Sequence, residues 1–441
     1  MGFLAERRAR QAGNRAAVAA AGARQQAGQE TDRLTAEGRA QRRAGAREAA
    51  AATLAEAARL GTDLLGPDDP RTLLAGSEHG RTLMLLRRWA EAEQALRAVA
   101  DAAAPHPDQR RLALRLDALG ALGAVLLRHG RPAAAAAVLE EHRELARQLE
   151  YDLAGSLSAE DLADAYVLLA RGAEAVHLYA DTAAHREAGA AAGRSDAAVL
   201  RLRAKLARAL LLLGHHVQAE RAARAVLGAA ADDPAGTGRW MAAAALSRAL
   251  VLQDRAAEGE AVAREAAAWP RAGGPESALP LRIGHALAAA LNAQQRHREA
   301  LELVLAQLAV RAAAAGPAGT AGPADASAAP GGEPGETGEA ATVYHYDLAA
   351  ALLGLGRPEE ARQAVEGLVA HCRAALAPHD HTGLVVGTLY GRVLAALGRT
   401  EEARSELAAN VAAWREGYGP EHVRTLAAER ALAAVREPDE G

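Results

Sequence analysis

The chain has 441 residues and a formal net charge of −4, so it has no general electrostatic attraction to nucleic acid or to anionic membranes. Half of the residues are hydrophobic but only 3% are aromatic, and alanine and leucine supply most of the apolar content, which favours helices over strands. The single cysteine, Cys372, excludes an internal disulfide, and no apolar run predicts a transmembrane helix or a secretory signal, so we expect a cytoplasmic protein.

Residues 1–45 form a basic, Arg- and Ala-rich N-terminal segment with few large side chains, which we expect to be helical or frayed. Its strings ERRARQAGNR and RAQRRAGAR leave a nucleic-acid-binding arm open as an alternative. Acidic residues are interleaved with the basic ones and aromatic partners are missing, so we do not expect nucleic acid as a partner. The following residues, 46–69, predict a capping helix that closes a degenerate repeat.

Two nine-residue strings 353 positions apart are nearly the same: LGPDDPRTL at residues 65–73 and YGPEHVRTL at residues 418–426. Proline cannot continue the helix before it, and an acidic residue is favourable at the start of the helix after it. Each string therefore predicts a joint between two helices, and the pair indicates a chain built from copies of one unit.

A second string, G-R-x-x-E-A, marks a turn inside each unit. It is clearest in LGRPEEA (355–361) and LGRTEEA (397–403). With its looser copies it gives anchor residues about 42 positions apart, except for one interval that is longer by 19: Ala92, Ala135, Ala175, Ala219, Gly259, Ala300, Ala361 and Ala403. A small residue stands 12 positions before each anchor, and it lets a neighbouring helix approach closely. The pattern predicts repeats 1–6 at residues 70–311 and repeats 7–8 at residues 342–418.

These Leu-small-x-x-Leu and G-R-x-x-E-A elements resemble the tetratricopeptide repeat (TPR) family. The period is similar to that of the longer variant found in kinesin light chains and in actinobacterial proteins. The resemblance covers roughly residues 70–436, and it implies an all-α, right-handed superhelical solenoid of about eight helix-turn-helix repeats with terminal capping helices. It also implies that the first helix of each repeat lines the concave side, where ligands of the family usually bind.

Two segments depart from the repeat. Residues 312–341 contain Gly and Pro throughout and no bulky apolar group, so they predict a disordered loop between repeats six and seven. Residues 419–441 predict a C-terminal capping helix and a tail. Because this helix has no second helix of its own, it either caps the solenoid or pairs with a second subunit, and a homo-oligomer stays open.

No motif points to catalysis or to a cofactor. Lys205 is followed by Leu206, which excludes a P-loop, and there is no HExxH, CxxC or GxGxxG string that opens a βαβ unit. One cluster at residues 371–381 could ligate a metal in principle, through His371, Cys372, His379, Asp380 and His381. Two of its histidines fall in an inter-repeat joint, where polar residues are ordinary. We therefore expect a solvated joint, no metal, no cofactor and no enzymatic activity.

Basic residues gather at positions that would face the groove implied by the resemblance, namely Arg201, Arg208, Arg248, Arg282 and His285, with Lys205 adjacent to them. Repeats one and eight add Arg81 and Arg392, whereas repeat three carries Glu160, Asp161 and Asp164. Arginine can capture a carboxylate through two parallel hydrogen bonds, so these residues predict peptide binding with a preference for acidic segments.

The first functional hypothesis is thus a non-enzymatic scaffold or adaptor that binds a protein or peptide. One alternative is a sensory transcriptional or signalling regulator whose groove senses a peptide or partner. Another is that the cations only keep an Ala-rich helix in solution.

Overall fold

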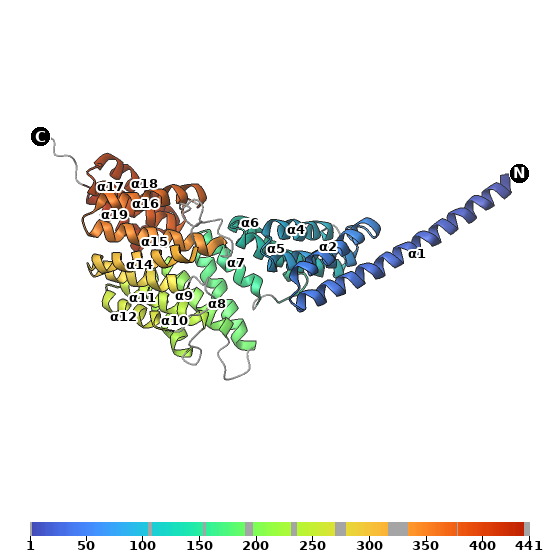
Figure 1. The fold of residues 1–441 in the computed structure, drawn as a ribbon, viewed down its shortest axis with the longest axis horizontal. Coiled ribbons are helices and arrows are strands. Elements are labelled where there is room, and N and C mark those ends of the chain that lie inside the picture. Colours follow the sequence, from blue (N-terminus) through green and yellow to red (C-terminus); the bar gives the residue numbers. More distant parts are fainter. Residues whose placement is uncertain are drawn as a thin grey trace. The chain divides into compact units, whose positions relative to one another are not determined.

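The computed structural model describes residues 2–104, 108–152, 156–189, 197–230, 236–269, 279–315, 334–376 and 378–435. At residues 2–17, 189, 279, 311–315 and 334–342 it describes the backbone alone. Every regular element in these ranges is an α-helix (Figure 1). The chain divides into two compact units, residues 1–153 (unit 1) and residues 154–441 (unit 2).

Unit 1 is built from antiparallel helix pairs. Its described residues form α1 (Gly2–Arg43) with α2 (Arg47–Leu64), α3 (Pro70–Leu85) with α4 (Trp89–Ala103), and α5 (Gln109–Arg128) with α6 (Pro132–Gln148). Helices α1, α3 and α5 contact one another in that order. Arg39 and Arg42 near the end of α1 form ion pairs with the buried carboxylate of Glu78 on α3. The basic N-terminal segment therefore supplies the first helix of the pair that α2 closes.

Unit 2 continues the same alternation. Its helices are α7 (Leu157–Leu168), α8 (Gly172–Gly189), α9 (Ala197–Leu212), α10 (His216–Ala229), α11 (Thr237–Val251), α12 (Ala256–Ala267), α13 (Leu279–Ala293), α14 (His297–Ala315), α15 (Pro334–Gly354), α16 (Pro358–Ala375), α17 (His381–Ala396), α18 (Thr400–Tyr418) and α19 (Val423–Ala433).

A continuous layer, which we call the inner row, is formed by the odd-numbered helices of unit 2 from α9 to α19. Contacts run from α9 to α11, α13, α15, α17 and α19 in turn, while the even-numbered helices α10, α12, α14, α16 and α18 pack between neighbours of this row. This two-layer arrangement of paired helices is the one expected for a helical-repeat solenoid. The number of TPR-like repeats stays a prediction of the sequence.

The two nine-residue strings form the same local structure, as the sequence predicted. Each turns at a glycine with positive φ, +106° at Gly66 and +85° at Gly419, a region of backbone conformation that glycine adopts without steric strain. The next helix is then capped by a side chain. Asp69 accepts a hydrogen bond from the Arg71 N–H at 3.0 Å, and the ring of His422 accepts one from the Arg424 N–H at 3.2 Å.

The G-R-x-x-E-A string has a physical explanation in the turn. The G position has φ between +70° and +80° at Gly130, Gly214, Gly356 and Gly398, and between +58° and +60° at Arg87, Ala170, Asp254 and Gln295. This is the left-handed residue that commonly ends a helix. The R and E positions then form an ion pair across the first turn of the next helix, as in Arg357–Glu360 and Arg399–Glu402.

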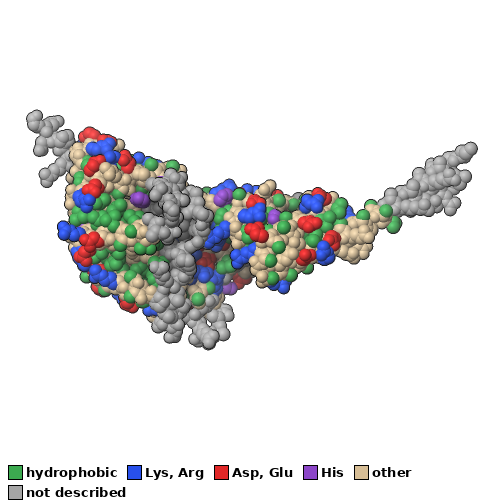
Figure 2. All heavy atoms as spheres, in the orientation of Figure 1, with side chains coloured by type: hydrophobic (Ala, Val, Ile, Leu, Met, Phe, Trp, Pro, Cys, Tyr) green, Lys and Arg blue, Asp and Glu red, His purple; other side chains and the backbone are tan. Residues whose placement is uncertain are grey.

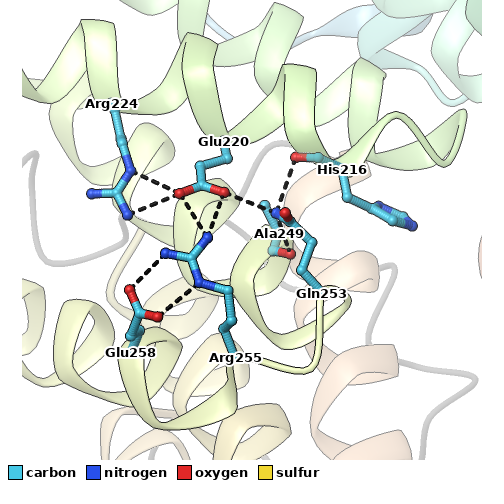
Figure 3. A network of polar contacts seen from close by, with 7 residues as sticks. All are labelled: His216, Glu220, Arg224, Ala249, Gln253, Arg255 and Glu258. Atoms are coloured by element: carbon cyan, nitrogen blue, oxygen red, sulfur yellow. Dashed lines mark hydrogen bonds and ion pairs between the residues drawn. The ribbon is translucent and has the colours of Figure 1, made fainter.

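Figure 3 shows one such turn in which the pair is extended into a network. Arg255 binds Glu258 at 2.7 Å and also Glu220 of the preceding pair at 2.9 Å. Glu220 in turn accepts hydrogen bonds from Arg224 and from Gln253. Neighbouring repeats are thus linked by ion pairs at their turns.

Small residues allow the paired helices to approach closely. A Cβ at Gly80 would lie 2.6 Å from Cγ of Leu96, and a Cβ at Gly391 would lie 2.5 Å from Cγ of Leu407. Both leucines are fully buried. Burying such a side chain stabilises the fold by about 1.5–3 kcal/mol, so the small position before each anchor has a packing role.

The range that the sequence predicted as a loop, residues 312–341, is shortened in the structure, because helices enter it from both ends. Helix α14 continues to Ala315 and α15 begins at Pro334, so both helices extend into residues 312–341. Residues 316–333 lie outside the described residues, as do 436–441 of the expected tail. Helix α19 packs on α17 and α18. Its pairing with a second subunit stays a prediction.

The surface carries charges of both signs. Figure 2 shows Lys and Arg side chains interspersed with Asp and Glu side chains on the face that is visible, without a large field of one sign. Among the described helices, none is both long enough and apolar enough to cross a membrane.

Candidate functional site

The inner row of unit 2 carries all six residues that the sequence singled out for peptide binding. Arg201, Lys205 and Arg208 lie on α9, Arg248 lies on α11, and Arg282 and His285 lie on α13. The structure does not bring them into one group. They divide between an acid-rich cluster at the α7–α9 contact and a cluster farther along the row.

The first group, the Glu160 cluster, is fully paired within the chain. Glu160 on α7 accepts two hydrogen bonds from Arg201, at 3.1 and 3.0 Å, and lies 2.9 Å from Nζ of Lys205. Lys205 also binds Asp164 at 2.5 Å, and the Tyr179 hydroxyl donates to the same carboxylate. The acidic residues of repeat three therefore neutralise two of the predicted peptide-binding cations.

The pKa directions agree with this pairing. Burial alone would raise the pKa of Glu160, which is 5% exposed, but Arg201 and Lys205 outweigh burial and hold the pKa at about 2. Burial would likewise lower the pKa of Lys205, and the two carboxylates raise it instead. The Glu160 cluster is thus ionised and internally balanced at neutral pH.

The second group begins with a chain of contacts that ends in the interior. Nη1 of Arg248 lies 3.0 Å from Nε2 of His285, and Nδ1 of His285 lies 2.7 Å from a carboxylate oxygen of Asp347 on α15. Since the guanidinium can only donate, Nε2 accepts and the ring proton lies on Nδ1, which donates to Asp347. Burial raises the pKa of Asp347, and interactions with His285 and Arg248 offset part of that rise.

The other cations singled out by the sequence are more scattered. Arg208 and Arg282 are half-buried on the inner row. Arg81 lies in unit 1, where it pairs with Asp117, and Arg392 is exposed on α17.

The structure adds a residue that the sequence reasoning missed, Arg424 at the start of α19. The preceding joint reaches α9, because Nε2 of His422 donates to the carbonyl oxygen of Leu212 at 3.1 Å although the two residues are 210 positions apart. A Cβ at Gly214 would lie only 2.9 Å from Cδ2 of the same ring. The repeated joint was the available signal, since Arg424 occupies in the second copy the place of Arg71 in the first.

An aromatic cluster fixes this joint. The fully buried ring of Trp414 stacks on His422, with ring centroids 5.5 Å apart and an interplanar angle of 15°, and it meets His381 edge-on at 5.3 Å. Tyr418 contacts all three rings. The joint is therefore packed rather than solvated, and His422 is only 7% exposed. His381, which belongs to the cluster where a solvated joint was expected, packs against the rings of Trp414 and Tyr418.

The residues considered for metal binding serve other purposes. Asp380 caps α17 by accepting hydrogen bonds from the backbone of Thr382 and Gly383. Cys372 is buried, and burial raises the pKa of its thiol to about 11. Within the ranges that the structure describes, no three His, Cys, Asp or Glu side chains are grouped in a way that could hold a metal ion.

Comparisons with known proteins bear on the fold. No family model matches the chain, and no curated protein matches it. Among solved structures, the apo quorum sensor NprR from B. thuringiensis is similar over 81% of this chain and 93% of its own, with 12% identity and a TM-score of 0.55. A putative kinesin light chain from Podosopora anserina, built from nearly identical TPR-like repeats, is 21% identical and covers 51% of this chain and 98% of its own, with a TM-score of 0.35.

A tetratricopeptide repeat protein from Parabacteroides merdae also matches, with 12% identity over 82% of this chain and 97% of its own and a TM-score of 0.34. The helix pairs, the two-layer packing and the likeness to NprR agree with the resemblance read from the sequence. The chain has the fold of a TPR-type helical-repeat protein.

Proposed function

We propose that this protein is a non-enzymatic binding scaffold whose inner row in unit 2 receives an acidic segment of a partner protein or peptide. The observation that supports this most directly is Arg248. It lies half-buried on α11, and the side chain that it contacts is a histidine ring and not a carboxylate. A guanidinium in such a place can form a strong, charge-assisted pair with an incoming carboxylate.

The proposal is narrower than the hypothesis drawn from the sequence. Arg201 and Lys205 are already bound to Glu160 and Asp164, so an acidic ligand would have to compete with two carboxylates fixed within the chain. We therefore assign the ligand to the part of the inner row formed by α11 and α13, with Arg248 on α11 as its main contact and Arg282 on α13 as a second contact.

A sensory regulator is the second candidate. NprR, whose fold this chain shares, is a quorum sensor. A regulator of that kind would change the exposure of unit 1 when unit 2 binds its ligand, whereas a passive scaffold would not. Hydrogen exchange of unit 1 with and without a bound peptide separates the two.

Selection from a random heptapeptide display library tests the proposal. The baits are the wild-type chain, the double variant Arg248→Glu/Arg282→Glu, and the control Arg221→Glu/Arg298→Glu, which makes the same charge change at exposed positions of α10 and α14. We expect the wild type and the control to enrich Asp- and Glu-rich peptides and the inner-row variant to lose them. Arg201 is left unchanged, because reversing its charge would set it against Glu160 and would disturb folding.

Selected peptides without an excess of acidic residues would contradict the preference for acidic segments. The same set of peptides on all three baits would contradict the assignment to the inner row.

A further inference from the structure

The C-terminal joint brings a second arginine, Arg424, to the inner row in the neighbourhood of Arg248. Contact of His422 with Leu212 and Gly214 places the start of α19 beside the end of α9. Arg424 follows two residues later, and its N–H is held by the His422 ring, so its position is set by a capped helix and a packed aromatic joint. It is half-buried, and it is close enough to Arg248 for the two charges to repel.

We call this group the Arg424 cluster: Arg248, Arg424, His216, His381 and His422. No described residue gives Arg424 a carboxylate partner, and the nearby carboxylate of Asp347 is bound to His285. Both ring nitrogens of His216 are buried and have no hydrogen-bond partner among the described residues. In Figure 3 the His216 ring points away from the Glu220 network.

The cluster therefore has positive charge and unused hydrogen-bonding groups without a matching anion. Burial and the charge of Arg424 lower the pKa of Arg248 to about 10. Burial and Arg424 likewise lower the pKa of His216 and, far more strongly, that of His381. The positive charge thus remains on the two arginines while the histidines stay neutral. Two half-buried guanidinium groups whose charges repel raise the free energy of the folded state unless an anion lies near both.

We propose that Arg248 and Arg424 together bind one oxyanion, a carboxylate on an acidic segment, which bridges α11 and α19 across the inner row of unit 2. The inference rests on the proposed function, and it adds the C-terminal capping helix to the binding machinery. Binding of such a segment would hold the C-terminal joint against the middle of unit 2, because the ligand contacts both.

The first experiment measures thermal stability without any ligand, in a buffer without oxyanions. Arg424→Glu would supply the missing carboxylate to Arg248, so we expect its midpoint of unfolding to rise above that of the wild type. Arg430→Glu makes the same change at an exposed position of the same helix and is expected to leave the midpoint unchanged. A lower midpoint for Arg424→Glu than for Arg430→Glu would overturn the proposed electrostatic arrangement.

The second experiment measures binding by calorimetry with a capped tri-glutamate peptide and, separately, with inorganic phosphate. We expect the peptide to bind the wild-type chain about tenfold more tightly than Arg424→Gln or Arg248→Gln, as the loss of one charge-assisted contact predicts, while Arg430→Gln binds like the wild type. Equal affinity in the wild type and Arg424→Gln would overturn the proposal. Binding of phosphate but not of the peptide would overturn the carboxylate assignment and leave an oxyanion site of another kind.

The outcomes separate this inference from the proposed function. Acidic peptides that bind the wild type and Arg424→Gln equally well, but not Arg248→Gln, would support the scaffold and exclude the bridge. If the display selection yields no acidic peptides while tri-glutamate binds in an Arg424-dependent manner, the bridging site stands and the proposed preference for longer acidic segments fails.

Discussion

The two copies of the nine-residue joint, at residues 65–73 and 418–426, have one local structure and two electrostatic environments. Each turns at a glycine with positive φ and caps the next helix with a side chain. In the first copy, Nε of Arg71 lies 3.2 Å from a carboxylate oxygen of Asp32 on α1. In the second copy, the charge of Arg424 acts on Arg248 and on the buried ring of His381 instead of on a carboxylate.

This difference separates what the local sequence decides from what the fold decides. Gly-Pro, a capping residue and an apolar residue suffice to make the turn and to start the helix. Whether the arginine finds a partner depends on the helix that packs opposite, which is α1 in unit 1 and the inner row in unit 2. A repeated element can therefore serve as a structural joint in one place and carry an uncompensated charge in another.

The Glu160 cluster shows what happens when cations of the inner row do have carboxylate partners. We expect its disruption to cause the largest change in the free energy of unfolding. Glu160→Gln removes the carboxylate that the partly buried side chains of Arg201 and Lys205 share, whereas the ion pair of Lys205 with Asp164 remains. Denaturant unfolding followed by tryptophan fluorescence should show that the free energy of unfolding falls by about 3 kcal/mol, because the change removes one member of a buried ion pair. Three of the four tryptophans, at 240, 269 and 414, lie in unit 2, so the signal reports mainly on that unit.

The matched control is Glu174→Gln, which removes an exposed carboxylate that pairs with Arg171 three residues away. This change should lower the free energy of unfolding by no more than about 0.5 kcal/mol.

The pH dependence of stability gives an independent measurement. The folded-state pKa of Glu160 is about 2, below its ordinary value of 4.5, so its contribution is complete above pH 4.5 and is lost as the pH falls toward 2. Equal losses in the two variants would show that Glu160 is not the centre of the cluster.

The second joint predicts a loss of stability on acidification in a higher pH window, through His422. Burial lowers its pKa to about 4, helped by His216 and Arg424, although the hydrogen bond to the Leu212 carbonyl opposes this. The folded state thus binds the proton less readily than the unfolded state, whose pKa is near 6.5. Stability from the neutral ring is complete above pH 6.5 and declines by about 1–3 kcal/mol as the pH falls toward 4.

His422→Asn isolates this effect, because asparagine can still cap α19 but does not titrate. We expect the free energy of unfolding at pH 7 to fall by about 1–2 kcal/mol because the ring contacts are missing. Between pH 6.5 and 4 it should then depend less on pH than in the wild type. His177→Asn, at an exposed histidine of α8, should keep the wild-type profile. A variant profile as steep as that of the wild type would assign the titration to other histidines, such as His381 or His216.

The sequence predicted most of the fold because its signals are local and repeated. The left-handed residue before each R position, the ion pair that follows it and the small residue opposite a buried leucine all act within one helix pair. Such elements recur with one period, and stacking them produces the two layers. The ends of α14 and α15 were not predicted, since the Ala- and Glu-containing flanks of the Gly/Pro segment are compatible with helix.

The candidate site was predicted in part. Periodicity placed Arg201, Lys205 and Arg248 on the inner row, but it could not tell that Glu160 reaches the first two from α7. It also could not place Arg424 near Arg248. The distance between these two residues depends on how far the row of first helices curves, which is the sum of many small rotations between neighbouring repeats and is not encoded in any one of them.

The smallest change in stability is expected for the arginines of the two joints, Arg71 and Arg424. The sign of this change shows whether the two joints differ in their electrostatics. Arg71→Ala removes an exposed ion pair with Asp32 and should lower the free energy of unfolding by about 0.3–0.5 kcal/mol. Arg424→Ala removes a repulsion from Arg248, so it should leave stability unchanged or raise it, in a buffer without oxyanions. Calorimetric unfolding of the full chain, with Asp32→Ala and the double variant Arg71→Ala/Asp32→Ala to complete a cycle, measures the first value. Equal losses at Arg71 and Arg424 would mean that Arg424 has a stabilising partner after all, and the two joints would then be alike in charge as well as in shape.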